Sequence, residues 1–142
     1  MSIPIVSIVG KSDAGKTTLM EKLIAELKRR GYRVGTIKHD THGFEIDRPG
    51  KDSWRHAQAG SDVVVIASPK KMAFIKRLDE ELSLDEVASF ITDVDIILTE
   101  GYKRADKPKI EVHRREKGDD LLCSSEELLA IATDTPLDVP VP

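Results

Sequence analysis

A complete phosphate-binding loop near the start of the chain limits the possible folds more than any other feature. Residues 10–17 read G-K-S-D-A-G-K-T and match the pattern G-x-x-x-x-G-K-[ST]. The loop follows an apolar run and precedes a helical stretch, which is the context that the motif requires. An ordinary glycine-rich turn is the alternative. The context favours binding of a nucleoside triphosphate, with Lys16 on the β- and γ-phosphates and the Thr17 hydroxyl on Mg²⁺.

Composition narrows the class of protein. A chain of 142 residues is typical of one domain, so residues 1–142 are expected to form a single nucleotide-binding domain. A net charge of −3 gives no broad surface for nucleic acid, and no apolar run is long enough to span a membrane. The one cysteine, Cys123, excludes an intrachain disulfide and is expected to be an unreactive thiol. Without a signal-peptide pattern, a cytosolic location is expected.

The order of apolar and helical segments predicts an α/β fold of the phosphate-loop NTPase type. We expect a mostly parallel, twisted sheet with helices on both faces, and a β-hairpin insertion. Strands are expected at residues 3–9, 32–38, 95–101, 110–113 and 128–133, helices at 17–30, 51–59 and 84–91, and the hairpin at 63–68 and 71–75. Such a sheet usually closes with another helix, so a truncated C-terminus is one interpretation.

Polar residues follow three of the expected strands, where ligands of parallel sheets bind. Glu100 ends a buried strand and suits the acidic residue that holds Mg²⁺ or its water ligands; an exposed glutamate in a turn is the alternative. Asp134 could accept hydrogen bonds from the N1 and N2 donors of guanine, or could start the turn before Pro136.

The third polar stretch follows the second strand and contains His39, Asp40, His42, Asp47, Lys51 and Asp52. Asp47 and Asp52 are candidate Mg²⁺ ligands, because this ion prefers oxygen. A zinc site from the two histidines and a carboxylate is another interpretation, although the spacing is not diagnostic. A structural hydrogen-bonding role for either histidine also remains open.

Several of these motifs together resemble one family. The matching segments are residues 10–18, G-T-I-K-H at 35–39, His42, D-R-P-G-K-D-S at 47–53, Ala59-Gly60, I-L-T-E-G-Y-K at 97–103 and A-I-A-T-D at 130–134. In this order they resemble the molybdopterin-guanine dinucleotide biosynthesis protein B family (MobB). The block at 47–53 is specific, whereas the phosphate loop alone is not.

The resemblance implies a GTP-binding, weakly hydrolysing adapter that is typically a homodimer. It would assist the nucleotidyltransferase that joins GMP to molybdopterin, and molybdopterin itself is a further candidate partner. Lys16 and Glu100 would serve hydrolysis, and Thr17, Asp47, Asp52 and Glu100 would serve Mg²⁺. The residues expected to bind GTP are Gly10, Lys11, Ser12, Asp13, Ala14, Gly15, Lys16, Thr17, Thr18 and Lys51 from the resemblance, and Asp134 from its position at the end of the last strand.

The chain departs from the expected pattern in its loop. Ser12-Asp13-Ala14 replaces smaller residues, and Asp13 brings a negative charge close to the phosphates. Lys11 also imitates a lysine of the partition-type ATPases that reaches the nucleotide of a partner subunit. Arg48 and Arg55 are local candidates for an arginine finger, with solvated surface roles as the alternative.

A basic stretch follows Glu100, and it includes Lys103, Arg104, Lys107, Lys109, Arg114 and Arg115. It could meet the phosphate of molybdopterin or an acidic partner. The acidic neighbours Asp106, Glu111 and Glu116 dilute its charge, so a solvated loop is the default expectation.

Two other functions use the same phosphate loop. A small-molecule kinase would need an acceptor site and a mobile lid, for which the chain has little room. A GTPase metallochaperone fits His39 and His42, but the sequence lacks a Cys-x-x-Cys or histidine-rich tract.

Overall fold

The computed structural model describes residues 2–142, which divide into two compact units. One unit comprises the chain up to Asp40 together with Leu84–Pro142, and the other is Thr41–Ser83. No helix within residues 2–142 is long and apolar enough to cross a membrane. We describe each unit by itself.

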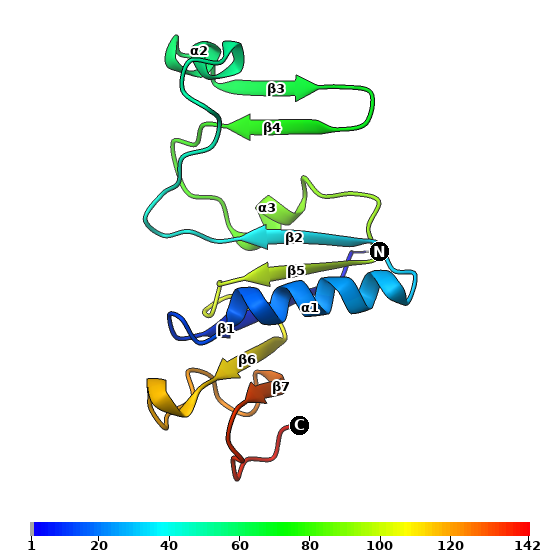
Figure 1. Ribbon diagram of the computed structural model, residues 1–142, viewed down its shortest axis with the longest axis vertical. Coiled ribbons are helices and arrows are strands. Elements are labelled where there is room, and N and C mark those ends of the chain that lie inside the picture. The colour runs from blue at the N-terminus through cyan, green and yellow to red at the C-terminus, as the bar shows by residue number, and fades with distance from the viewer. Residues whose placement is uncertain (1) are drawn as a thin grey trace. The chain divides into compact units, whose positions relative to one another are not determined.

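The first unit is built on a parallel sheet of five strands (Figure 1). In spatial order the strands are β2 (Val34–Lys38), β5 (Ile96–Glu100), β1 (Ile5–Gly10), β6 (Lys109–His113) and β7 (Leu128–Thr133). Every pairing in the sheet is parallel, so all five strands end at the same edge. The expected parallel α/β sheet is therefore confirmed.

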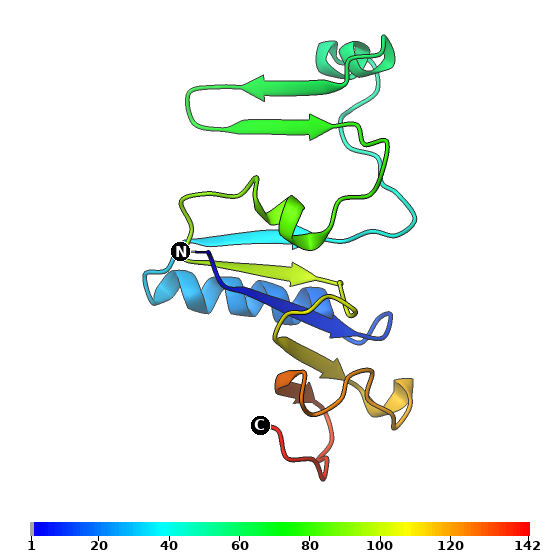
Figure 2. The ribbon, with the colours of Figure 1, turned by 180° about the vertical axis from the view of Figure 1, so that it is seen from behind.

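Alternate side chains of the sheet pack against helices on its two faces. Val6 and Ile8 of β1 pack with the apolar stripe of α1 (Lys16–Arg29). Ile5 of the same strand packs instead with Leu84 of α3 (Leu84–Ala88). Figure 2 shows α3 in front of the sheet with α1 behind it. Helices thus cover both faces, as the sequence predicts.

α3 is shorter than the helix expected at residues 84–91. The amides of Phe90 and Ile91 donate to the carbonyl oxygens of Val87 and Ala88, three residues back. This tighter bonding ends the α-helix, and Asp93 then adopts a positive φ of 61°. Gly31, with a φ of 91°, follows the C-terminus of α1 in the position expected from the sequence.

The second unit contains α2 (Asp52–Gln58) and the antiparallel hairpin of β3 (Val63–Ala67) and β4 (Met72–Lys76). The hairpin expected from the sequence is confirmed. Val64 is buried and α2 packs on β3. The opposite side of the hairpin carries Val63, Val65, Met72 and Phe74, whose exposures range from 38% to 68%. These side chains make this side of the hairpin apolar and partly exposed to solvent.

Candidate functional site

The phosphate-binding loop joins β1 to α1 and depends on two glycines. A Cβ on Gly10 would lie 2.8 Å from the carbonyl oxygen of Val112, so β6 passes too close for any side chain. Gly15 precedes the helix with a φ of 107°, a conformation that L side chains rarely adopt. Its carbonyl accepts the amide of Leu19 and starts the helical ladder. The helix N-terminus therefore lies directly at the end of the loop.

Asp13 is the unusual residue of this loop. Its φ of 60° lies in the left-handed region, which aspartate tolerates better than most residues. The substitution of Asp for a smaller residue is thus compatible with the turn. Its carboxylate remains an exposed negative charge beside the phosphate site.

The two lysines of the loop hold carbonyl oxygens of their own chain. Lys16 Nζ donates to the carbonyl of Gly10 at 3.1 Å, folding back over the loop. Lys11 Nζ donates to the carbonyl of Lys117 at 2.9 Å. Lys11 therefore points to the turn after β6.

Thr17 and Glu100 meet at the mouth of the loop. The Thr17 hydroxyl donates to Glu100 Oε1 at 2.7 Å, which joins the first turn of α1 to the end of β5. A hydroxyl and a carboxylate oxygen are the ligand types that Mg²⁺ prefers. The donor set of Thr17 and Glu100 therefore fits a magnesium ion.

An open pocket of about 550 Å³ surrounds this pair. It is lined by Ser12, Asp13, Gly15, Lys16, Thr17, Thr18, Lys38, His39, Glu100, Gly101 and Arg114. The structure thus brings together the loop, Glu100 and the first histidine of the polar stretch. The pocket also includes Lys38 and Arg114, whose place at this site the motifs do not predict. Their position directly at the ends of β2 and β6 is the signal that could have identified them.

His39 is fixed by the neighbouring strand end. Its ring stacks on Tyr102 with centroids 4.2 Å apart and planes at 16°. The His39 amide donates to the carbonyl of Glu100. A Cβ on Gly101 would lie 3.2 Å from the Cβ of His39. Tyr102 adopts a φ of 60° to complete this arrangement. The stack orders the backbone that carries Glu100.

Asp47, Lys51 and Asp52 lie in the second unit. Ser53 donates to Asp47 Oδ2 at 2.6 Å, and the Arg48 amide donates to Oδ1 at 2.9 Å. The Ser53 hydrogen bond is the main cause that lowers the pKa of the Asp47 carboxyl. The specific block 47–53 is thus closed by a hydrogen bond between its first and last residues.

Asp134 lies at the end of β7, beside the turn after β6. Its Oδ1 accepts the amide of Arg115 at 3.1 Å. The neighbouring Thr133 hydroxyl contacts His113 Nδ1 at 3.2 Å. The residue proposed for guanine is therefore tied to the turn that Lys11 also holds.

No three histidine, cysteine or carboxylate side chains of residues 2–142 form a cluster suited to a metal ion. His39 belongs to the first unit and His42 to the second, so the zinc interpretation stays a prediction.

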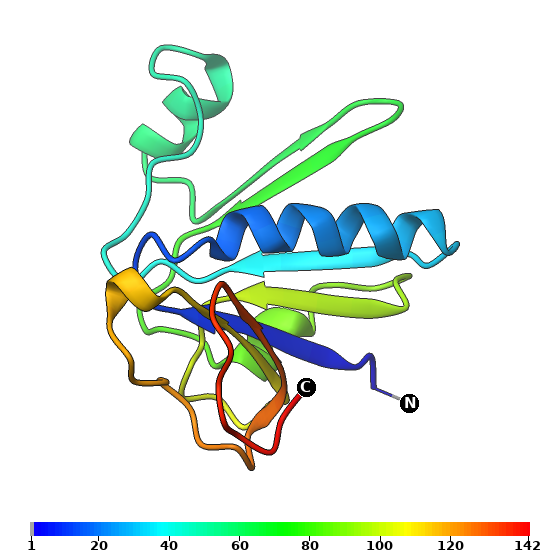
Figure 3. The same cartoon turned by 60° about the horizontal axis from the view of Figure 1, so that its bottom comes forward.

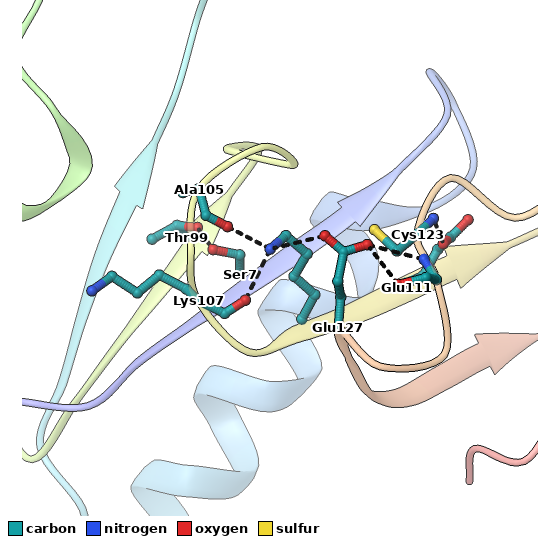
Figure 4. A network of polar contacts seen from close by, with 9 residues as sticks. Ser7, Thr99, Ala105, Lys107, Glu111, Cys123 and Glu127 are labelled. Atoms are coloured by element: carbon teal, nitrogen blue, oxygen red, sulfur yellow. Dashed lines mark hydrogen bonds and ion pairs between the residues drawn. The ribbon is translucent and has the colours of Figure 1, made fainter.

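The basic stretch after Glu100 is not uniformly solvated, which corrects the default expectation for one of its lysines and for one of its acidic neighbours. Lys109 and Glu111 are only 2% and 1% exposed. Figure 4 shows the contacts that compensate their charges. Lys109 Nζ donates to the carbonyls of Ala105 and Lys107 and lies 4.0 Å from Glu127 Oε1. Buried charges persist in a fold only when they are paired in this way.

Glu111 accepts hydrogen bonds from two consecutive amides, those of Leu122 at 2.7 Å and Cys123 at 3.0 Å. Burial, together with the negative charge of Glu111, raises the pKa of the Cys123 thiol. Because the thiolate is the reactive form, Cys123 is suited to packing and not to catalysis.

The sequence profile of the family described as "Molybdopterin guanine dinucleotide synthesis protein B" (MobB) matches residues 5–134. The chain belongs to the MobB family. It is 43% identical over 139 residues to the molybdopterin-guanine dinucleotide biosynthesis adapter protein of Haemophilus influenzae, covering 96% of this chain and 78% of that relative. The adapter protein of Escherichia coli is 37% identical over 145 residues, covering 98% and 83%.

Solved structures support the same MobB assignment. The crystal structure of Bacillus subtilis MobB superposes with a TM-score of 0.78 and 29% identity, covering 99% of this chain and 88% of that one. A crystal structure of molybdopterin-guanine biosynthesis protein B gives a TM-score of 0.74 and 36% identity, covering 96% and 86%. The resemblance based on the motifs is thereby confirmed.

Proposed function

We propose that this MobB-family protein is a GTP-binding adapter that assists the attachment of GMP to molybdopterin. The contact that carries the proposal is the 2.7 Å hydrogen bond between Thr17 and Glu100 at the mouth of an intact phosphate loop. This contact supports a magnesium site, because phosphate-loop proteins hold the magnesium ion of a nucleotide with a hydroxyl of the loop and a nearby carboxylate. Family membership supplies the pathway in which this site acts.

The proposed roles follow from the geometry of the loop. Backbone N–H groups at the start of α1 bind the phosphates, and Lys16 exchanges the Gly10 carbonyl for the β- and γ-phosphates. Mg²⁺, when bound, neutralises phosphate charge, and Thr17 and Glu100 hold it or its water ligands. Asp134 selects guanine by accepting its N1 and N2 hydrogens.

Asp47, Lys51 and Asp52 belong to the second unit. Their roles, the two aspartates as carboxylate ligands of the magnesium ion and Lys51 as a positive charge for the phosphates, stay predictions from the sequence.

Hydrolysis of GTP is expected to be weak. Positioning and charge stabilisation supply the rate of phosphoryl transfer, and even a phosphate-loop GTPase with an arginine of its own turns over at only about 10⁻² per second. We therefore assign the main role to binding, with Lys16 and Glu100 serving a slow GTPase reaction.

The partners we propose are the nucleotidyltransferase that makes the guanine dinucleotide, molybdopterin, and a second copy of this chain. Exposed apolar side chains on one side of the hairpin, Val63, Val65 and Met72, support a homodimer, because contiguous apolar patches on a surface mark sites of association. The cytoplasm suits this role, since a reducing compartment preserves the free thiol of Cys123.

Calorimetry with GTP, ATP and GDP in the presence of Mg²⁺ tests the proposal. We expect the wild type to prefer GTP and Lys16→Ala to lose this binding. Lys22→Ala, which removes an exposed lysine of α1, is the matched control. A preference for ATP would contradict the role of Asp134 and favour a kinase, which should also phosphorylate an added metabolite.

Capture of the nucleotidyltransferase in the GTP-bound state tests the adapter role. Tight nickel or zinc binding that depends on both His39 and His42 would favour the metallochaperone instead.

A further inference from the structure

The turn after β6 is fastened to the phosphate-binding loop. It contains the short 3₁₀ helix η1 (Arg115–Lys117) and ends at Gly118. Lys11 of the loop donates to the Lys117 carbonyl, and a Cβ on Gly118 would lie 2.8 Å from Lys11 Nζ. Figure 3 shows η1 beside the connection between β1 and α1.

Two further contacts fix the same turn to the sheet. His113 Nε2 lies 3.1 Å from the Gly118 carbonyl, and the Arg115 amide donates to Asp134 at 3.1 Å. The turn is therefore held by the phosphate loop, by β6 and by the end of β7. A residue at its start has a defined position relative to the phosphates.

Arg114 is the residue at this position. It leaves β6 in an extended conformation and lines the pocket together with Ser12, Asp13 and Lys16. Its Nη1 donates to Glu116 Oε1 at 3.2 Å, and its side chain is 51% exposed. The guanidinium is thus held at the rim of the pocket by a pair that solvent weakens.

We propose that Arg114 acts within its own chain as the arginine that stabilises the charge of the transferred phosphoryl group, and that Glu116 restrains it before the nucleotide binds. This inference rests on the proposed GTP binding. A guanidinium offers several planar donors to phosphoryl oxygens, which the single ammonium of Lys38 cannot match. In the reaction, a water oxygen bonds to the γ-phosphorus while the bond to the β,γ-bridging oxygen breaks. GDP and phosphate leave, and one proton passes to solvent.

The structure favours Arg114 over the arginines that the sequence suggested. Arg48 and Arg55 belong to the second unit, whereas Arg114 belongs to the same unit as Lys16 and Glu100. Arg114 lines the pocket around these two residues and is carried by a turn that contacts the loop directly. Its role would explain why Lys11 holds that turn by a hydrogen bond within the same chain.

Single-turnover hydrolysis and nucleotide affinity of Arg114→Ala, Arg114→Lys and Glu116→Gln test the inference on the full chain. We expect Arg114→Ala to lower the hydrolysis rate at least about tenfold. The loss should be smaller than the ~10³- to 10⁵-fold rate enhancement of an enclosed arginine finger, because the Arg114 side chain is half exposed. Its affinities for GTP and GDP should stay within about threefold, while the tighter binding of GDP with aluminium fluoride, a mimic of the transferred phosphoryl group, is lost. Arg114→Lys should recover only part of the rate.

Glu116→Gln should raise the rate by up to about fivefold, since an exposed ion pair is worth little and its loss frees the arginine. Arg104→Ala, which removes an exposed arginine outside the pocket, is the matched control. If Arg114→Ala hydrolyses GTP and binds the fluoride complex as Arg104→Ala does, the inference is wrong while the GTP-binding adapter stands.

If the wild type binds GTP without hydrolysing it, the role of Arg114 is wrong but the GTP-binding function stands. A wild type that fails to bind GTP would remove the proposed function as well. An unchanged rate in Glu116→Gln, with a slow Arg114→Ala, would overturn the restraint by Glu116.

Discussion

The Thr99 hydroxyl donates a hydrogen bond to the Ser7 hydroxyl oxygen, 2.8 Å away, in the interior of the parallel sheet. The two residues are register partners on β5 and β1, and both are fully buried. Thr99→Val keeps the shape of the side chain but leaves Ser7 without this donor. We expect the free energy of unfolding to fall by about 1–3 kcal/mol, measured by urea denaturation.

The double variant Ser7→Ala/Thr99→Val is the control for this pair. Because it removes both polar partners, it should be more stable than Thr99→Val alone. A double variant that loses the sum of the two single effects would contradict a direct coupling between the hydroxyls.

Glu100→Gln should weaken the magnesium-dependent part of GTP binding. The amide can still contact Thr17, but the negative charge that holds the ion or its water ligands is lost. Interactions with a charged group are worth about 1.5–3 kcal/mol, so we expect roughly a tenfold or larger loss of affinity in Mg²⁺. Calorimetry in Mg²⁺ and in EDTA measures it, with Glu21→Gln on the exposed side of α1 as control. An equal loss in EDTA would argue against a magnesium role.

Ser53→Ala should raise the pKa of the Asp47 carboxyl, because the Ser53 hydroxyl is the main cause of its lowered pKa. A carboxyl whose pKa is lowered by folding stabilises the folded state above its unfolded pKa and loses this effect as pH falls through its folded pKa. The variant should therefore be less stable than the wild type at neutral pH, and the difference should close in strong acid. NMR titration of the carboxyl carbon reads the pKa, and unfolding curves read the stability. An unchanged Asp47 titration would contradict the assignment.

Lys109→Met should destabilise the first unit although methionine matches the aliphatic length of lysine. The carbonyls of Ala105 and Lys107 would lose their buried donor, at a cost of about 2–4 kcal/mol for the two groups. Thermal or urea unfolding measures the loss. Lys103→Met, at an exposed position, should change stability by no more than about 0.5 kcal/mol.

Local patterns were sufficient to predict most elements of this fold. The run at residues 3–9 could be assigned as a strand because it is almost continuously apolar and precedes the phosphate loop, and the structure has β1 at Ile5–Gly10. The hairpin followed from two β-prone runs around Pro69-Lys70. The insertion of β5 between β1 and β2 is different, because strand order depends on non-local packing that no sequence window contains.

Charge in the sequence was less informative about burial. In the sequence, Lys109 and Glu111 resemble parts of a solvated stretch. Their hydrogen-bond partners include backbone groups, which every residue carries, so the sequence gives no sign that their charges are compensated. The Thr17–Glu100 contact could be predicted, since both residues belong to motifs with a known relation to the phosphates. Arg114 could not be distinguished from its basic neighbours until the turn after β6 was placed against Lys11.

The close approach of Gly10 to the Val112 carbonyl shows that a residue of this loop can be required by the fold and not by the nucleotide. Glycine at position 10 is required by the spacing of β1 and β6 whether or not a nucleotide is bound, whereas Lys16 contributes only a carbonyl contact to the protein itself. In a homologue that has lost nucleotide binding, we therefore expect Lys16 to be substituted early. Gly10 should stay conserved for as long as β1 and β6 remain paired.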